Sequence, residues 1–429
     1  MSRRNRLAPT PPMGWNSWNC YGTTVREDEV LANAEAMRRH LLPVGYDTVV
    51  VDIQWYEPNA RAHGYRKDAE LCLDAWGRMI PAANRFPSAA DGKGFTPLAD
   101  RIHAMGLRFG IHVMRGIPRQ AVAQRLPILG ADGATADQCA LPDRLCSWCT
   151  DMVGVDVAKP AGRAWYASLA RLFADWGVDY VKADDMGTPH WGDEIAALRS
   201  ALDGCGRDIV LSISPGIGAD TANADSYLDQ CELWRISPDL WDSWDKPQPW
   251  YAGMAEQFDL LARWAPFSGP GHFADADMLP MGRLGLRAEH GEDRLSRLSL
   301  VEQRSMIALW SIARSPLMFG GDLPSLDPAT LAILVNPVAR AAHRDGRLQA
   351  ELHRDGPLRV WRSRHHDGRG AFIGLFNLSD QPLAGTWPVA EGTPTGTWTE
   401  AWTGASLHRP QAIAYALRPH GSALYRIEP

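Results

Sequence analysis

Short apolar runs recur along the first 330 residues, and each follows a stretch with helical spacing and ends in polar groups. Their apolar residues are largely continuous and do not alternate with polar ones, which is typical of strands buried on both faces of a parallel sheet. The clearest runs are YDTVVVDIQW (46–55), LRFGIHVM (107–114), VDYVKADD (178–185), DIVLSISPG (208–216) and CELWRISPD (231–239). This repeated strand–helix unit predicts an α/β fold, a (β/α)8 TIM barrel, in preference to an open doubly wound sheet. The sequence has no G-x-G-x-x-G after the first run, which disfavours dinucleotide binding.

The pattern changes after about residue 335, where short β-type runs alternate with Gly, Pro, Asp and Ser turns. No long helical period is visible there, so this part predicts an antiparallel β-sandwich. We therefore expect two domains, a barrel over residues 1–335 and a C-terminal β-sandwich over residues 336–429.

Composition narrows the function classes. A net charge of −6 offers no basic excess for phosphate, so nucleic acid is not expected as a partner. The N-terminal MSRRNRLAPTPPMGW lacks the apolar core of a signal peptide, and no stretch approaches the roughly 20 apolar residues of a membrane span. These features predict a cytoplasmic protein without a membrane partner, although a trimmed chain would leave a periplasmic or secreted location open.

Seven cysteines are present, and Cys146-Ser-Trp-Cys149 has the C-x-x-C spacing of a redox or zinc site. No second C-x-x-C and no nearby pair of histidines completes a metal cage. We interpret the cysteines as free thiols in a reduced compartment, and we expect neither a metal nor another cofactor.

The predicted strands end in residues that carry chemistry. In a (β/α)8 barrel the C-terminal ends of the strands meet at one face, which carries the active site. The residues that converge there are Trp15, Trp18, Asp52, Trp55, His112, Arg115, Lys182, Asp184, Asp185, Ser214, Arg235 and Asp239. Paired carboxylates among aromatic residues fit glycoside hydrolysis, and the 18 Trp of the chain suit a cleft that stacks on sugars.

Six motifs between about residues 10 and 340 carry a family resemblance: PPMGWNSWNCYG, GYDTVVVDIQW, WGVDYVKADD, RISPDLWDSW, GPGHFADADML and ALWSIARSPLMFGGDL. Through these six motifs, taken in this order, the chain resembles glycoside hydrolase family 27. That family contains α-galactosidases and α-N-acetylgalactosaminidases, and also β-L-arabinopyranosidases and isomaltodextranases. The resemblance implies a barrel followed by a β-domain, and a glycosidase that acts on a sugar substrate.

The resemblance also implies roles for single residues. The K-x-D strand end makes Asp184 the nucleophile, and the R-x-x-x-D motif makes Asp239 the acid/base. Independently, Lys182 lies two residues before Asp184 on the same face, where its charge favours the carboxylate form. The resemblance places Trp18 as an aromatic wall, Met278 under the ring, and Asp52, Lys182 and Arg235 at sugar hydroxyls. To these substrate-binding residues the strand ends add Trp55, His112 and Ser214, and the loop of Cys146 adds Trp148.

Two positions depart from the family pattern. Ile53 stands where α-galactosidases have a second aspartate that grips the sugar, which puts plain galactose recognition in doubt and fits a sugar without the C6 hydroxymethyl. Asp185 and Met186 replace the cysteine that usually follows the nucleophile, so the loop of Cys146 is held some other way or lies free.

Together these features predict a retaining, exo-acting glycoside hydrolase for terminal α-D-galactosides or β-L-arabinopyranosides. An α-glucan-directed, isomaltodextranase-type enzyme is the alternative, and a non-catalytic sugar-binding barrel is a weaker one. Sugar binding by the C-terminal domain, the aglycone and assembly into a homo-oligomer stay open.

Overall fold

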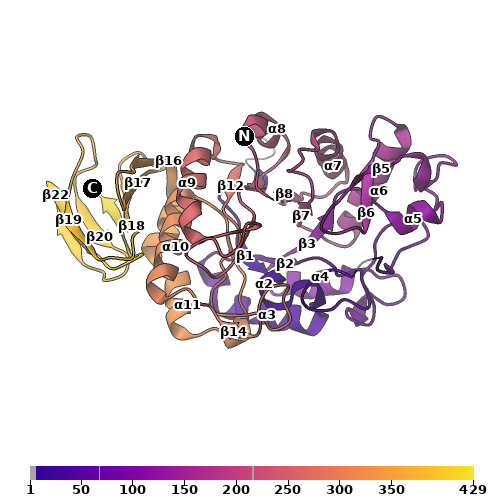
Figure 1. The fold of residues 1–429 in the computed structure, drawn as a ribbon, viewed down its shortest axis with the longest axis horizontal. Helices are drawn as coiled ribbons and strands as arrows, with labels where there is room; N and C mark the ends of the chain where they lie inside the picture. The colour runs from indigo at the N-terminus through magenta and orange to yellow at the C-terminus, as the bar shows by residue number, and fades with distance from the viewer. Residues whose placement is uncertain (1–5, 67, 215–216) are drawn as a thin grey trace.

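The computed structural model describes residues 6–66, 68–214 and 217–429 (Figure 1). Eight parallel strands form its central sheet. The segment after β12 forms a parallel bridge from Leu279 to Phe319 of β15, so the sheet closes into a barrel and the predicted (β/α)8 fold is confirmed. The strands lie in the order β12 (Phe273–Asp275), β9 (Leu233–Arg235), β8 (Val210–Ser214), β7 (Tyr180–Asp184), β3 (Arg108–Met114), β2 (Thr48–Val51), β1 (Met13–Asn16) and β15 (Leu317–Phe319).

The predicted apolar runs become barrel strands that are shorter than the runs themselves. β2 reads TVVV and is buried at every position, as a strand covered on both faces must be. β1 approaches β2 at Gly14, where a Cβ would lie 2.0 Å from the carbonyl oxygen of Thr48. Only glycine permits that pairing. The last two residues of the predicted run 208–216 lie outside the described residues.

Helices surround the barrel. They are α2 (Trp18–Tyr21), α3 (Glu27–His40), α4 (Thr96–Ala104), α5 (Arg119–Ala123), α6 (Pro160–Asp175), α7 (Gly192–Gly204), α8 (Ala224–Gln230), α9 (Met254–Trp264), α10 (Leu300–Ala313), α11 (Pro328–Leu334) and α12 (Pro337–Asp345). Ser299 caps α10 by accepting a hydrogen bond from the backbone of Glu302. α10 is buried on nearly all sides because it packs between the barrel and the C-terminal strands (Figure 1). None of the helices in the described ranges has the length and apolar character that a membrane span requires.

Three small sheets extend the loops between the barrel elements. An antiparallel sheet of β4 (Ile117–Pro118), β6 (Met152–Val155) and β5 (Ala140–Leu145) lies between β3 and α6. Beyond β9, the parallel pair β10 (Asp239–Leu240) and β11 (Tyr251–Ala252) places Asp239 beside Tyr251. The third is the antiparallel pair β13 (Arg283–Leu284) and β14 (Arg294–Leu295). The first two insertions carry residues predicted for the active site.

The C-terminal strands form two antiparallel sheets. The larger has the order β16 (Gly346–His353), β17 (Leu358–His365), β18 (Ala371–Asn377), β23 (Ser422–Glu428), β20 (Thr397–Glu400) and β21 (Ser406–His408), and the smaller pairs β19 (Leu383–Pro388) with β22 (Ala412–Leu417). Both sheets contribute to one apolar core, which includes Val360, Leu375 and Ile413, so the predicted β-sandwich is confirmed.

The C-terminal sheet lies against the barrel at α9 and α10 (Figure 1). The rings of Trp244 and His420 stack there at 4.0 Å, and the Ser305 hydroxyl donates to the carbonyl of His420 at 2.6 Å. The domain boundary at residue 335 stays a prediction, because α12 lies between the barrel elements and β16 and packs on α10.

Candidate active site

The ends of β2 and β7 form a buried ion pair at the barrel mouth. Lys182 Nζ lies 2.8 Å from Asp52 Oδ2, and the side-chain amide of Asn16 donates to the same oxygen at 2.7 Å. Burial would raise the pKa of Asp52, but the charge of Lys182 and the hydrogen bonds of Lys182 and Asn16 lower it to about 2. The pKa of Lys182 is raised, because the charge of Asp52 outweighs the loss of hydration. Asp52 is therefore a permanently ionised acceptor for hydroxyl donors.

Asp184 ends β7 in an environment that favours its ionised form. His112 Nε2 lies 3.2 Å from Asp184 Oδ2, and the register of β3 with β7 places His112 beside Lys182. Burial raises the pKa of Asp184, but the hydrogen bond from His112 and the charges of Lys182 and Arg235 bring it below its usual value. A carboxylate kept ionised at the end of a barrel strand suits a nucleophile.

Asp239 sits at the start of β10, four residues after the end of β9, and contacts Arg235 at 2.5 Å. Its side chain is 31% exposed, against 13% for Asp184. Its pKa is raised, because burial and the negative charges of Asp277 and Asp184 outweigh the lowering effects of Arg235 and Lys182. The pKa values of the two carboxyls are thus shifted in opposite directions, which is the pattern of a nucleophile paired with a general acid.

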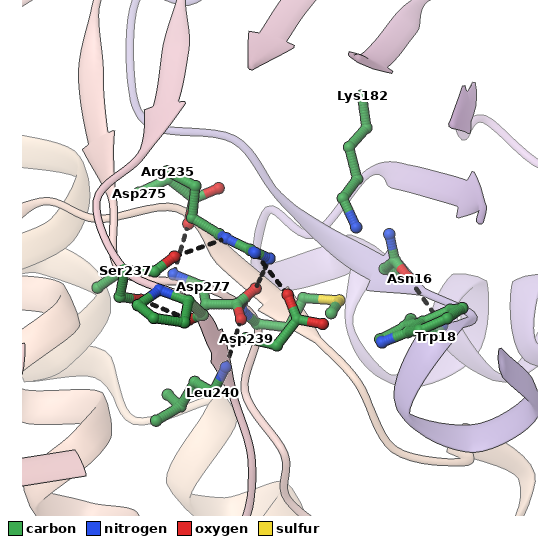
Figure 2. Close-up of polar contacts among 12 residues, drawn as sticks. Asn16, Trp18, Lys182, Arg235, Ser237, Asp239, Leu240, Asp275 and Asp277 are labelled. Carbon is green, nitrogen blue, oxygen red and sulfur yellow. Dashed lines mark hydrogen bonds and ion pairs between the residues drawn. The ribbon is translucent and has the colours of Figure 1, made fainter. Parts of the chain in front are cut away.

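The residues of Figure 2 face one another from two sides of the site. Arg235 and Asp239 lie opposite Asn16, Trp18 and Lys182. Trp18 is anchored by a hydrogen bond from its backbone amide to the side chain of Asn16 at 2.8 Å. A sugar seated between the two groups would meet charged donors, carboxylate acceptors and one aromatic face.

Three aromatic rings form a wall on the Trp18 side. The ring of Tyr65 stacks on Trp18 at 6.2 Å between centroids, and it contacts Trp148 at 5.3 Å. The predicted residues Trp18 and Trp148 are therefore linked through Tyr65, which sequence reasoning missed. Tyr65 lies in the long connection between β2 and α4, where no periodic pattern or motif singles it out.

A small cavity of about 20 Å³ lies inside the barrel mouth, with room for about one water molecule. Among its lining residues are the predicted Ser214, Met278, Lys182 and Arg235. The buried hydroxyl of Ser214 has no hydrogen-bond partner among the described residues. This cavity marks the inner end of the site.

The prediction that Trp55 binds substrate is wrong. Its side chain is fully buried, and its ring packs on Tyr56, Phe95 and Trp176 in the layer behind the strands. Its indole N–H donates to the carbonyl of His112 at 2.8 Å. With its one polar atom used by the backbone, Trp55 is part of the core and not a substrate-binding residue.

The residues on either side of Ile53 also form hydrogen bonds within the protein. Ile53 is 2% exposed, and its backbone amide donates to Asp52 Oδ1 at 2.9 Å. The side-chain amide of Gln54 donates to the carboxylate of Asp151 at 2.5 Å. Asp151 is a buried carboxyl that sequence reasoning missed, and burial raises its pKa. The indole N–H of Trp55 and the side-chain N–H of Gln54 are thus both bonded within the protein.

The loop that carries Cys146 and Trp148 is fastened by a buried arginine. Arg115 donates to the carboxylate of Asp185 at 2.7 Å, to Glu194 at 3.0 Å and to the carbonyl of Arg144 at 2.9 Å. Arg115 is 1% exposed and Glu194 is fully buried. Among the described residues, none of the seven cysteines forms a disulfide bond. Asp185, the residue after Asp184, therefore holds this loop through an ion pair.

Two further residues around Arg235 were not singled out from the sequence. Asp277 lies 3.1 Å from Arg235, and Asp275 pairs with Arg235 in the register of β12 with β9. Both belong to the motif GPGHFADADML, which had drawn attention only to Met278. Within the described ranges, no three His, Cys, Asp or Glu side chains are arranged to hold a metal ion.

The known proteins that this chain resembles are glycosidases. A family model described as alpha galactosidase A matches residues 150–345. The α-N-acetylgalactosaminidase of Gallus gallus is 30% identical over 415 residues, which cover 91% of this chain and 85% of that protein. The solved structure of a GH27 β-L-arabinopyranosidase from Geobacillus stearothermophilus is 43% identical, with a TM-score of 0.94 over 99% of this chain and 98% of that one. A variant of that enzyme in complex with arabinose is 42% identical, with a TM-score of 0.94 over 99% of both chains.

Proposed function

The chain belongs to glycoside hydrolase family 27 and is a glycosidase, and from that premise we propose that it is a retaining, exo-acting enzyme for terminal β-L-arabinopyranosides. Terminal α-D-galactosides are the second candidate substrates. The two sugars share the same ring arrangement, and the arabinopyranose lacks the C6 hydroxymethyl group.

The observation that carries this choice is the apolar, buried Ile53 between Asp52 and Gln54. In a galactoside the C6 hydroxyl would need a partner at this place, and a buried hydroxyl left without one costs about 1–3 kcal/mol. The side-chain N–H groups of its neighbours in the sequence are already bonded, Gln54 to Asp151 and Trp55 to the carbonyl of His112. An arabinopyranoside has no hydroxymethyl group to leave unpaired.

The relatives support the same choice. At 42–43% identity the similar solved structures are those of a β-L-arabinopyranosidase, and one of them holds arabinose. The α-galactosidase of Oryza sativa is more distant, at 26% identity over 99% of this chain. That relative and the match to the alpha galactosidase A model keep galactosides as the second candidate.

In the first step, the ionised carboxylate of Asp184 attacks the anomeric carbon. The bond from that carbon to the leaving oxygen breaks, its electron pair stays on the oxygen, and this oxygen takes the proton of Asp239. The lowered pKa of Asp184 and the raised pKa of Asp239 suit these two roles. Lys182, Arg235 and Asp52 would hold the ring hydroxyls, with the Trp18 ring against an apolar face.

In the second step, a water molecule attacks the anomeric carbon of the glycosyl-enzyme and gives its proton to the Asp239 carboxylate. The bond to Asp184 breaks, and its electron pair returns to that carboxylate. Each step inverts the anomeric centre, so the product keeps the configuration of the substrate.

A panel of four aryl glycosides tests the proposal: β-L-arabinopyranoside, α-D-galactoside, α-N-acetylgalactosaminide and α-glucoside. We expect the arabinopyranoside to be hydrolysed with the highest kcat/KM and the galactoside next. Proton NMR should show that the sugar first released has the anomeric configuration of the substrate. An inverted first product would refute the retaining mechanism. If all four glycosides stay intact while an α-glucan is degraded, the isomaltodextranase-type alternative replaces this one.

A further inference from the structure

Arg235 is shared by two carboxyl groups. Its guanidinium lies 2.5 Å from Asp239 and 3.1 Å from Asp277, and its Nε donates to the carbonyl of Ser237 at 3.1 Å. In Figure 2, dashed lines join the guanidinium of Arg235 to both aspartates. The side chains of Arg235 and Asp277 are 4% and 3% exposed, whereas Asp239 is 31% exposed and faces the site. Asp277 is thus the inner partner of an arginine whose outer partner is the proposed acid.

Asp277 also holds the peptide that follows Asp239. The backbone amide of Leu240 donates to Asp277 Oδ2 at 2.7 Å, and Asp277 Oδ1 accepts from the backbone amide of Met278 at 2.8 Å. One side chain therefore fixes both the guanidinium that touches Asp239 and the backbone next to it.

The position of Asp277 is itself tightly fixed. Its φ of 79° lies in the left-handed region that a non-glycine residue seldom occupies. Its amide donates to Asp275 Oδ1 at 2.9 Å, and its carbonyl accepts from the indole of Trp310 at 2.9 Å. These contacts from β12 and α10 hold the backbone in a conformation that places the carboxylate between Arg235 and Leu240.

An arginine in contact with a general acid presents an electrostatic problem. Its charge stabilises the ionised form of the acid, which cannot donate a proton. A second carboxylate on the same guanidinium offsets that charge. The charged and titratable groups that act on Asp239 come from several elements, namely Arg235, Asp277, Lys182, Asp184, Tyr65, Tyr251 and Glu289. Of these, Asp277 is the carboxylate bonded to the same arginine.

We propose that Asp277 is a positioning residue for the acid/base: it orients Asp239 through Arg235 and Leu240, and by neutralising Arg235 it leaves Asp239 as the carboxyl that carries the proton. The inference rests on the proposed role of Asp239. Asp277 acts through Arg235 and the Leu240 peptide, and no step of the reaction forms a bond to it.

Two substitutions on either side of the shared contact test this role through opposite pH effects. Asp277→Asn removes the offsetting charge, so the alkaline limb of the kcat/KM profile should move to lower pH by about one unit. Arg235→Gln removes the cation, so the same limb should move to higher pH. Shifts in the same direction, or no shift in either variant, would overturn the inference. If Asp277→Asn does not fold, a downward or absent shift in Arg235→Gln still overturns it.

Leaving-group dependence gives a second readout. In Asp277→Asn, kcat/KM should fall about 10²-fold on alkyl glycosides, which need acid assistance, and only a few-fold on dinitrophenyl glycosides. Equal losses on both would assign Asp277 a purely structural role.

Asp242→Asn is the matched control. Asp242 is also a buried aspartate paired with an arginine, Arg294, and it lies three residues after Asp239, but it does not contact Arg235. It should lower stability without moving the alkaline limb. Failure of the proposed function itself would be seen separately. In that case the loss of kcat/KM in Asp239→Ala would be the same for alkyl and dinitrophenyl glycosides.

Discussion

Lys182 Nζ lies 2.8 Å from Asp52 Oδ2, so a cation at the end of β7 and a carboxylate at the end of β2 are joined across the mouth of the barrel. Both are nearly buried, with side-chain exposures of 12% and 1%. The same carboxylate accepts a hydrogen bond from Asn16 at 2.7 Å. We expect the pair to stabilise the fold and to bind sugar hydroxyls, and the two roles can be separated by experiment.

Asp52→Asn should reduce the acid sensitivity of the fold. The pKa of Asp52 is about 2 in the folded state, below the ordinary value of 3.8 for an aspartate. The stabilisation is therefore fully present above pH 3.8 and is lost as the pH falls towards 2. The wild type should lose about 1 kcal/mol from this group between pH 5 and pH 3, and the variant should not.

The measurement is urea unfolding at several pH values within that window. Asp47→Asn, at the opposite end of β2, is the control and should keep the slope of the wild type. The KM of Asp52→Asn for glycosides should also rise. An unchanged dependence of stability on pH would mean that the Asp52–Lys182 pair contributes nothing to folding.

The two proposed catalytic carboxyls should respond differently to removal. Asp184→Ala should lose turnover on every substrate, because no covalent intermediate forms. Asp239→Ala should retain the first step on dinitrophenyl glycosides, which need little acid assistance, and lose about 10²-fold or more on alkyl glycosides. Azide should accelerate Asp239→Ala by attacking the glycosyl-enzyme without the help of a general base. Equal losses for the two variants on both substrate types would reverse or void the assignment.

The barrel strands and much of the site could be predicted because they produce local signals. An apolar run that ends in Lys182 and Asp184 places those side chains at the barrel mouth whatever the rest of the chain does. Trp55 gave the same signal at the end of β2, but its ring turned into the core, where the carbonyl of His112 takes its only polar atom. Residue type and position at a strand end do not fix the direction of a side chain.

The residues that were missed act through long-range contacts. Tyr65 reaches Trp18 and Trp148 from a connection without a repeating pattern. Asp277 matters because Arg235 and Leu240, about 40 positions earlier, converge on it. Such convergence depends on the closed barrel and has no counterpart in local sequence spacing.

Breaking the buried contact between Arg115 and Asp185 should destabilise the fold and loosen the loop of Trp148. Arg115→Gln leaves the carboxylate of Asp185 without its cation and Glu194 with only the 3.7 Å contact to Arg144, and breaking a buried pair in this way costs about 3–5 kcal/mol. We also expect KM to rise, since Trp148 belongs to the aromatic wall. Thermal unfolding and steady-state kinetics measure the two effects.

Arg283→Gln serves as the control for Arg115. Arg283 contacts Asp293 at 2.5 Å, but the two side chains are 41% and 46% exposed, so its loss should cost about 1 kcal/mol or less. Because the described residues contain no disulfide bond, a reducing agent should leave the activity of the wild type unchanged. Similar stability losses for the two arginine variants would show that Arg115 is not the fastening of this loop.

Ile53→Asp should shift the preference of the enzyme towards galactosides. The substitution places a carboxylate beside Asp52, where it could accept a hydrogen bond from the C6 hydroxyl of a galactoside. A hydrogen bond of this kind contributes about 1–3 kcal/mol when its absence leaves a buried partner unpaired. The ratio of kcat/KM for galactoside over arabinopyranoside should therefore rise by about 10-fold or more.

Ile53→Leu, which stays apolar, should keep the ratio of the wild type. Since Ile53 is 2% exposed, the folded state of Ile53→Asp is to be checked by circular dichroism. A folded Ile53→Asp with an unchanged ratio would show that residue 53 does not face the sugar, and it would remove the main support for arabinopyranoside as the substrate.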